Sequence, residues 1–267
     1  MSDRRPGART VWSRMWPMLA AAALAITIWQ LVYWSGFRPD YVLPSPATVA
    51  QELVERLKGP ELWQAIGTTM RRAAVGFTLS IVVGTAIGLA VARVQVLRAA
   101  VGSLITGLQT MPSIAWFPLT ILLLGTTEQA IMFVVVLGAA PSIANGLISG
   151  IDDLPPQLLR AARVLGARGA TLYTSIVMPA VLPTYLAGLK QGWAFAWRSL
   201  MAGELLVIIA KRPSLGNDLT FARDFANAPR LIAVMTVILI IGMIVDAIFG
   251  AVANGVRRRR GLGALRL

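Results

Sequence analysis

The chain has 267 residues, of which 56% are apolar and 14% charged, and it contains neither cysteine nor histidine. Soluble domains hold roughly 45–50% apolar and about 25% charged residues, so this composition indicates a membrane protein. Without cysteine there can be no disulfide or thiolate metal site. Without histidine the commonest general base and metal ligand is missing. We therefore expect no catalytic and no metal-binding residues.

The apolar residues are concentrated in long runs, and these predict an all-α membrane protein with about six transmembrane helices. The first run is long enough to stay in the membrane as an anchor, and no small-residue cleavage site follows it. We expect a tail over residues 1–16, a transmembrane domain over 17–255 and a basic tail over 256–267. The predicted spans are about 17–35, 63–91, 101–124, 129–149, 180–210 and 231–252.

The net charge of +13 would favour nucleic acid as a partner in a soluble protein. Here the basic residues lie mostly at the ends of the apolar runs, so we expect lipid headgroups and no nucleic acid. Six spans place both termini on one side, which then carries fourteen Lys and Arg residues against nine on the other. By the positive-inside rule both termini and the loop at 152–179 are cytoplasmic. Arg71 and Arg72 would then mark the outer end of the second span.

Two of the predicted spans have features that bear on packing. Met111-Pro112 and Pro118 interrupt the third span, because proline removes a backbone donor that neighbouring groups must replace. Gly84 and Gly88 in the second span have the small-xxx-small spacing that lets helices approach closely. We expect these glycines to pack within the subunit, rather than in a dimer interface.

The fifth span holds Lys190, Arg198 and Glu204. A charge in mid-membrane costs about 2.5–3.5 kcal/mol on insertion scales, so it normally faces a partner or a watery path. Lys190 is near enough to the cytoplasmic end to snorkel. Arg198, beside Trp197, either pairs with Glu204 or Asp246 in a structural role or lines a path and attracts an anion. The translocation-path candidates are Arg198, Trp197, Glu204 and Lys190.

The segment 152–183 is one of the few polar stretches, and it predicts two short helices joined at a glycine turn. Pro156 suits a first helical position, and Leu158, Ala162 and Leu165 would share one face. Gly166 and Gly169 end the first helix. A small two-faced helix pair between spans is suited to binding by another protein.

This segment resembles the EAA loop of the membrane permeases of bacterial ABC importers. In that family Glu-Ala-Ala is followed by three residues, Gly, nine residues, Ile, one residue and Leu-Pro. Here an arginine replaces the glutamate and a methionine replaces the leucine, which puts in question any salt bridge made by the family's Glu. The matching positions, which the resemblance assigns to an ATPase-coupling loop, are Arg160, Ala161, Ala162, Gly166, Ile176, Met178 and Pro179.

Three further stretches are similar to the permeases for alkanesulfonates, taurine and nitrate. They are 111–119 in the third span, Leu43-Pro44-Ser45-Pro46, and WRSLMAGEL at 197–205. With the loop, the resemblance covers nearly the whole chain beyond residue 16. It implies a type I ABC importer permease fold in the cell membrane and a small anionic substrate. Aliphatic sulfonates are the first choice, with taurine and nitrate as alternatives.

The resemblance also implies the partners. Two copies of the chain would form the path, two separate cytoplasmic ATPases would bind the helix pair, and an extracytoplasmic binding protein would deliver substrate. The sequence has no phosphate-binding glycine loop, so we expect ATP and Mg²⁺ on the ATPase and no cofactor in this chain. The competing class is a self-sufficient secondary carrier or channel. It would need an ion relay and repeated broken helices, and only one span is visibly broken.

Overall fold

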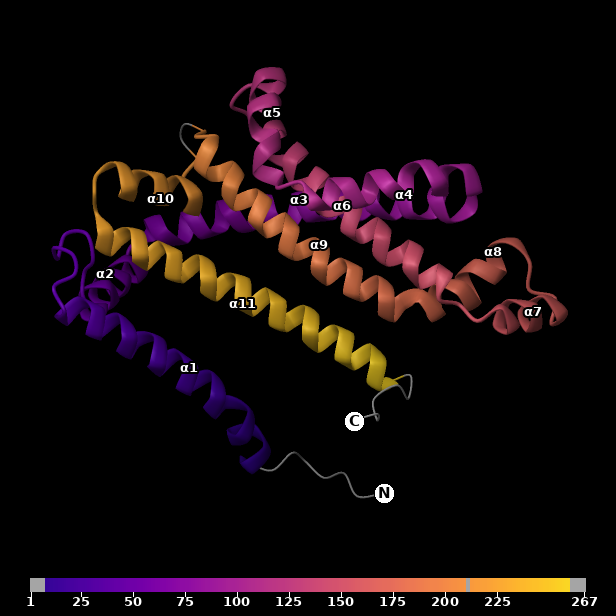
Figure 1. Ribbon diagram of the computed structural model, residues 1–267, viewed down its shortest axis with the longest axis horizontal. Helices are drawn as coiled ribbons and strands as arrows, with labels where there is room; N and C mark the ends of the chain where they lie inside the picture. The colour runs from indigo at the N-terminus through magenta and orange to yellow at the C-terminus, as the bar shows by residue number, and fades with distance from the viewer. Residues whose placement is uncertain (1–7, 210–211, 260–267) are drawn as a thin grey trace. The chain divides into compact units, whose positions relative to one another are not determined.

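The computed structural model describes residues 8–209 and 212–259, and within these residues it consists of helices and contains no strand (Figure 1). The chain divides into two compact units. One contains residues 1–60 and 219–236, and the other contains residues 61–218 and 237–267. α10 (Leu215–Asp224) and α11 (Ala228–Arg259) each run from one unit into the other.

The smaller unit contains α1 (Ala8–Trp34) and α2 (Pro46–Lys58). α2 begins at Pro46, because Ser45 caps it by accepting a hydrogen bond from the Thr48 N–H and Pro46 occupies the first turn. The Trp29 indole N–H donates to the Pro44 carbonyl at 3.1 Å, which ties α1 to the loop. Residues 8–16 of the predicted tail are helical, and residues 1–7 lie outside the described part of the chain.

The larger unit contains the helices from α3 to α9. They are α3 (Pro60–Arg93), α4 (Gln95–Thr110), η1 (Ser113–Trp116), α5 (Phe117–Leu124), α6 (Glu128–Asp152), α7 (Pro156–Val164), α8 (Gly169–Leu172), η2 (Tyr173–Val177) and α9 (Met178–Leu206). The predicted break in the third span is confirmed. α4 ends at Thr110, and the two halves of the apolar segment are bent by 98° at Met111-Pro112.

Small residues let α3, α6 and α9 pack with their backbones in contact. A Cβ added to Gly84 would lie 2.6 Å from the Ala140 carbonyl oxygen, and one added to Gly146 would lie 2.6 Å from the Gly188 Cα. Gly88 likewise faces Ala144 of α6. The expectation that Gly84 and Gly88 pack within the subunit is therefore confirmed. Close backbone approach replaces the hydrophobic driving force that lipid surroundings weaken.

Three described helices are long and apolar enough to cross a membrane: Pro60–Arg93, Glu128–Asp152 and Ala228–Val256. The bent pair of α4 with η1 and α5 would make a fourth, and Leu19–Trp34 is a shorter apolar helix. The six-span count and the orientation of the termini remain predictions.

Candidate functional site

α7 ends in a Schellman motif, the helix-terminating turn that a glycine favours. Gly166 has φ +87°, its N–H donates to the Arg163 carbonyl at 3.0 Å, and the Ala167 N–H donates to the Ala162 carbonyl at 2.9 Å. The left-handed backbone conformation at this position would cost any residue other than glycine roughly 1–2 kcal/mol. Gly169 also has a positive φ, +52°. The predicted glycine turn is therefore confirmed.

The chain then enters α9 with no interruption of the helix. α8 is followed by a widened π-helical turn, η2, in which the Met178 N–H bonds to the Tyr173 carbonyl. Pro179 has no N–H to bond to Ser175, and its ring disfavours a regular α-turn at that place. The π-turn lies directly before it and accommodates this defect. α7 and α8 are thereby joined to α9, the helix that carries Lys190, Arg198 and Glu204.

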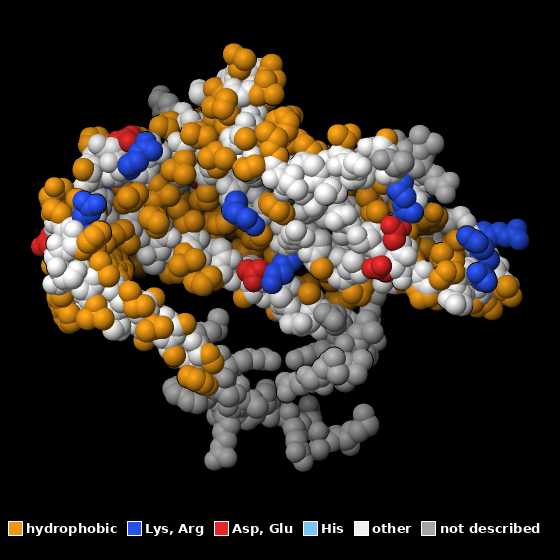
Figure 2. Space-filling model, viewed as in Figure 1, with side chains coloured by type: hydrophobic (Ala, Val, Ile, Leu, Met, Phe, Trp, Pro, Cys, Tyr) orange, Lys and Arg blue, Asp and Glu red, His pale blue; other side chains and the backbone are white. Residues whose placement is uncertain are grey.

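The tip of α7 exposes apolar side chains beside basic ones. Val164 and Leu165 are each 87% exposed, and Lys and Arg side chains gather over α7 in Figure 2. The expectation that Leu165 shares one helix face with Leu158 and Ala162 is wrong, because α7 ends at Val164 and Leu165 is its C-cap. Of the motif positions, Ala162 is buried, Ile176 and Met178 are half-buried, and Arg160, Ala161, Gly166 and Pro179 are exposed.

The base of this loop is held by two cationic side chains. The Arg93 guanidinium lies 4.9 Å from the centre of the Tyr173 ring in η2. Arg98 forms an ion pair with Asp152 at the end of α6. Leu159 and Leu172 pack on a small core around Val177. The exposed tip of α7 is therefore attached to a well-packed base. Such an arrangement suits a surface that transmits a displacement from another protein.

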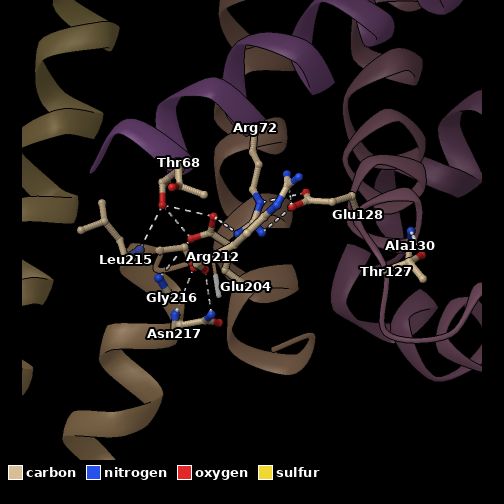
Figure 3. A network of polar contacts seen from close by, with 12 residues as sticks. Thr68, Arg72, Thr127, Glu128, Ala130, Glu204, Arg212, Leu215, Gly216 and Asn217 are labelled. Carbon is tan, nitrogen blue, oxygen red and sulfur yellow. Dashed lines mark hydrogen bonds and ion pairs between the residues drawn. The ribbon is translucent and has the colours of Figure 1, made fainter. Parts of the chain in front are cut away.

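A buried ion network lies near the end of α9 (Figure 3). Arg72 of α3 donates to Glu204 from Nη1 at 2.9 Å, and to Glu128 of α6 from Nε at 2.9 Å and Nη2 at 2.7 Å. Arg212 adds a third cation–carboxylate contact, 3.2 Å from Glu128. Two arginines and two glutamates thus neutralise one another.

Glu204 also organises the start of α10. Its carboxylate accepts hydrogen bonds from the Thr69 hydroxyl and from the Gly216 N–H at 3.0 Å. The Thr69 oxygen in turn accepts from the Leu215 N–H. The Glu204 side chain is fully buried, and these bonds occupy both of its oxygens. Such a carboxylate is tolerated in a buried place because it is paired and hydrogen-bonded.

These contacts correct the pairing predicted for Arg198. Glu204 bonds to Arg72, and Asp246 of α11 lies 3.1 Å from Lys190. Neither acid therefore neutralises Arg198, and Lys190 is paired rather than only snorkelling. The sequence placed Arg72 at a membrane interface, whereas the structure buries it.

Arg198 instead lines a pocket of about 390 Å³ between α9, α6 and the broken span. We call it the Arg198 pocket, and its lining includes Gln109, Met111, Ile114, Leu137, Phe195 and Arg198. The Arg198 Nε donates to the Ala194 carbonyl at 3.1 Å, and the guanidinium lies 5.0 Å from the Phe195 ring centre. Trp197 points elsewhere, since it stacks on Trp193 with ring centres 6.0 Å apart and packs near Gly242.

Sequence reasoning missed the roles of Arg72, Glu128 and Gln109. Arg72 and Glu204 are 132 positions apart, and no periodic pattern indicates which charges in distant helices meet. A signal was nonetheless present for Arg72. It lies well inside the long helix of α3, where an unpaired charge would be costly.

A family model described as "binding-protein-dependent transport system inner membrane component" matches residues 76–258. These residues include the broken span, α6, the α7–α8 loop, α9 and most of α11. The chain belongs to this family. It is therefore a multi-pass protein of the cell membrane and a permease component of an ABC transporter.

Relatives support this over most of the chain. A putative ABC transporter permease of Methanocaldococcus jannaschii is 29% identical, with 85% of this chain and 86% of that protein covered. A putative aliphatic sulfonates transport permease of Bacillus subtilis is 27% identical, covering 86% and 82%. A riboflavin transport system permease of Chloroflexus aurantiacus is 28% identical, covering 92% and 91%. Permeases named for taurine and nitrate are also among the relatives, so the names point to no single substrate.

Solved structures agree on the fold. The match to a bacterial alginate ABC transporter has a TM-score of 0.62 at 16% identity and covers 94% of this chain and 97% of that one. The match to the MetNI methionine ABC transporter has a TM-score of 0.61 at 19% identity and covers 74% and 98%. The permease therefore has the type I ABC importer fold predicted from the sequence.

Proposed function

We propose that this permease forms the translocation path of an ATP-driven importer for small anions, with aliphatic sulfonates as the first candidates and taurine and nitrate as alternatives. In this proposal the path is built by two copies of the chain. Two separate ABC ATPases bind the α7–α8 loop at the cytoplasmic face and hold the ATP and Mg²⁺. An extracytoplasmic binding protein delivers the substrate.

The observation that carries the proposal is the continuous helix of α8, η2 and α9, which joins the turn at the tip of α7 to the segment that bears Arg198. Val164 and Leu165 offer an apolar contact surface, and Arg160, Arg163 and Arg168 surround it with positive charge. Exposed apolar residues rimmed by polar ones mark protein-binding surfaces. Because η2 continues into α9, a displacement of the loop by a closing ATPase would tilt α9 and change access to the Arg198 pocket.

In this mechanism the positions that resemble the EAA motif have different roles. Ala161 keeps the exposed face of α7 slim enough to lie in a groove of the ATPase, Ala162 packs against the chain itself, and Gly166 sets the turn. Ile176, Met178 and Pro179 anchor the return into α9. Arg160, which replaces the family's Glu, would bind an acidic partner group instead of a basic one.

The test is Val164→Asp, which puts a charge into the proposed apolar contact. We expect loss of ATPase co-purification and of substrate-stimulated ATP hydrolysis in proteoliposomes, while the permease still inserts in the membrane. Val54→Asp in α2 is the matched control, since Val54 is also an exposed valine on a helix. Gly166→Val should act like Val164→Asp, because it strains the turn. Normal coupling in both loop variants would overturn the proposal.

A further inference from the structure

The Arg198 pocket lies where the helix of the third span is broken. Met111, Pro112 and Ser113 form the break and also line the pocket. Non-helical backbone at membrane depth is tolerated only where protein buries it or where it lines a water-filled cavity. The position of the break is therefore the one expected for a cavity that solvent or substrate enters.

The positive charge of Arg198 is not neutralised by protein. Among the described residues no carboxylate bonds to Arg198, and the two acids that the sequence offered as its partners, Glu204 and Asp246, are bonded to Arg72 and Lys190. Its hydrogen bond to the Ala194 carbonyl uses Nε, and its guanidinium carbon lies over the Phe195 ring. The two terminal nitrogens are the fork that binds oxyanions in bidentate fashion.

A second donor without a partner lines the same pocket. The side-chain nitrogen of Gln109 is shielded from solvent and makes no hydrogen bond to the rest of the described chain. A buried donor left unpaired is unfavourable, so an acceptor in the pocket would stabilise it. Gln109 belongs to α4 and Arg198 to α9, so one bound oxyanion would link two helices.

The remaining lining is mostly apolar. Met111, Ile114 and Leu137 contribute aliphatic side chains, and Ala202 leaves space beside them. The pocket volume of about 390 Å³ is within the range of small-ligand sites, which hold a few polar groups in an apolar wall. An inorganic anion would use the donors and leave this apolar surface without contacts.

We propose that the Arg198 pocket is a substrate subsite for amphiphilic anions, in which Arg198 and Gln109 bind the oxyanion head and the apolar wall holds a short hydrocarbon tail. This inference rests on the proposed import function and refines its substrate class. The pocket favours alkanesulfonate-type substrates over nitrate. Arg198 recognises the charge, and Ala202 with Leu137 limits the tail length.

The experiment uses the complete transporter, with ATPases and binding protein, reconstituted in proteoliposomes. Uptake of labelled butanesulfonate and methanesulfonate is measured for Arg198→Gln, Arg198→Lys, Gln109→Leu and Ala202→Leu. Arg223→Gln is the charge-matched control, because Arg223 lies in the other unit and pairs with Asp224 at the surface. Co-purification of the ATPases reports assembly separately from uptake.

We expect Arg198→Gln to assemble but to lose about tenfold or more of its butanesulfonate uptake, because a charge-assisted fork is lost. Arg198→Lys should retain an intermediate rate, and Gln109→Leu should lose less than Arg198→Gln. Ala202→Leu should shift the butanesulfonate-to-methanesulfonate ratio about tenfold towards methanesulfonate, since pocket volume discriminates by methylene groups. A structural defect alone would not change this ratio, because the binding protein is the same throughout.

The outcomes separate the subsite from the import function. If the assembled Arg198→Gln transporter takes up butanesulfonate at the wild-type rate, the subsite is wrong while the importer stands. If Ala202→Leu leaves the ratio unchanged, the tail assignment is wrong. If the wild-type transporter imports nitrate and neither sulfonate, the substrate class is overturned. Failure of the ATPases to co-purify with the wild-type permease would overturn the import function itself.

Discussion

Arg72 and Arg198 both lie inside helices of the larger unit of the permease, and their surroundings differ. Arg72 is buried and bonded to Glu128 and Glu204, and both of these carboxylates accept further hydrogen bonds. Arg198 borders a pocket, and its hydrogen bond within the described part of the chain is to a carbonyl of its own helix. A neutralised, fully bonded cation holds helices together, whereas a cation without a counter-ion beside a cavity is available to a ligand. Arg72 therefore stabilises the fold, whereas Arg198 is the residue for which we propose a role in recognition.

The largest expected effect comes from removing Arg72. Arg72→Met leaves the fully buried Glu204 without its cation, and breaking one partner of a buried pair costs about 3–5 kcal/mol. Thermal unfolding of the purified permease in detergent measures the loss. Arg212→Met is the matched control. The Arg212 side chain is 51% exposed, so its contact with Glu128 is expected to contribute about 1 kcal/mol or less. Equal losses in the two variants would contradict a structural role specific to the buried pair.

A smaller effect is expected at Gly216, because the lack of a side chain there lets α10 pack closely against Glu204. A Cβ at this position would lie 2.3 Å from the Glu204 Cβ. Gly216→Ala should therefore destabilise the permease by about 1–3 kcal/mol, the usual cost of overpacking. Gly67→Ala in α3 is the control, because a Cβ there meets no atom within 4 Å. A Gly216→Ala permease as stable as the control would show that α10 moves away from Glu204 at little cost.

The smallest effect on stability is expected at Arg198. Arg198→Met breaks no ion pair, so the change in unfolding free energy should stay within about 0.5 kcal/mol, as for substitutions away from packed features. Transport by the same variant should be strongly reduced. The two measurements sharpen the contrast with Arg72. Removal of Arg72 should lower stability, whereas removal of Arg198 should lower transport and leave stability nearly unchanged. A large loss of stability in Arg198→Met would remove the distinction between the two arginines.

Local sequence signals predicted several elements correctly. The turn at Gly166 follows from glycine at a helix end, and the break at Met111-Pro112 follows from the missing proline donor. The packing of Gly84 and Gly88 follows from the spacing of small residues along one helix face. Each of these properties depends on residues a few positions apart, so the local sequence is sufficient to predict it.

The partners of the charged side chains depended on tertiary structure. The sequence by itself determined that Lys190, Arg198 and Glu204 are unusual in an apolar helix, and its resemblance to ABC importer permeases predicted the family. Only the packing of the helices decided that Glu204 of α9 meets Arg72 of α3, that Asp246 of α11 meets Lys190 and that Arg198 faces a pocket. The physical reason is the distance along the sequence between the residues that interact. Helix periodicity specifies which face a residue occupies, whereas the choice of counter-ion depends on which distant helix packs against that face.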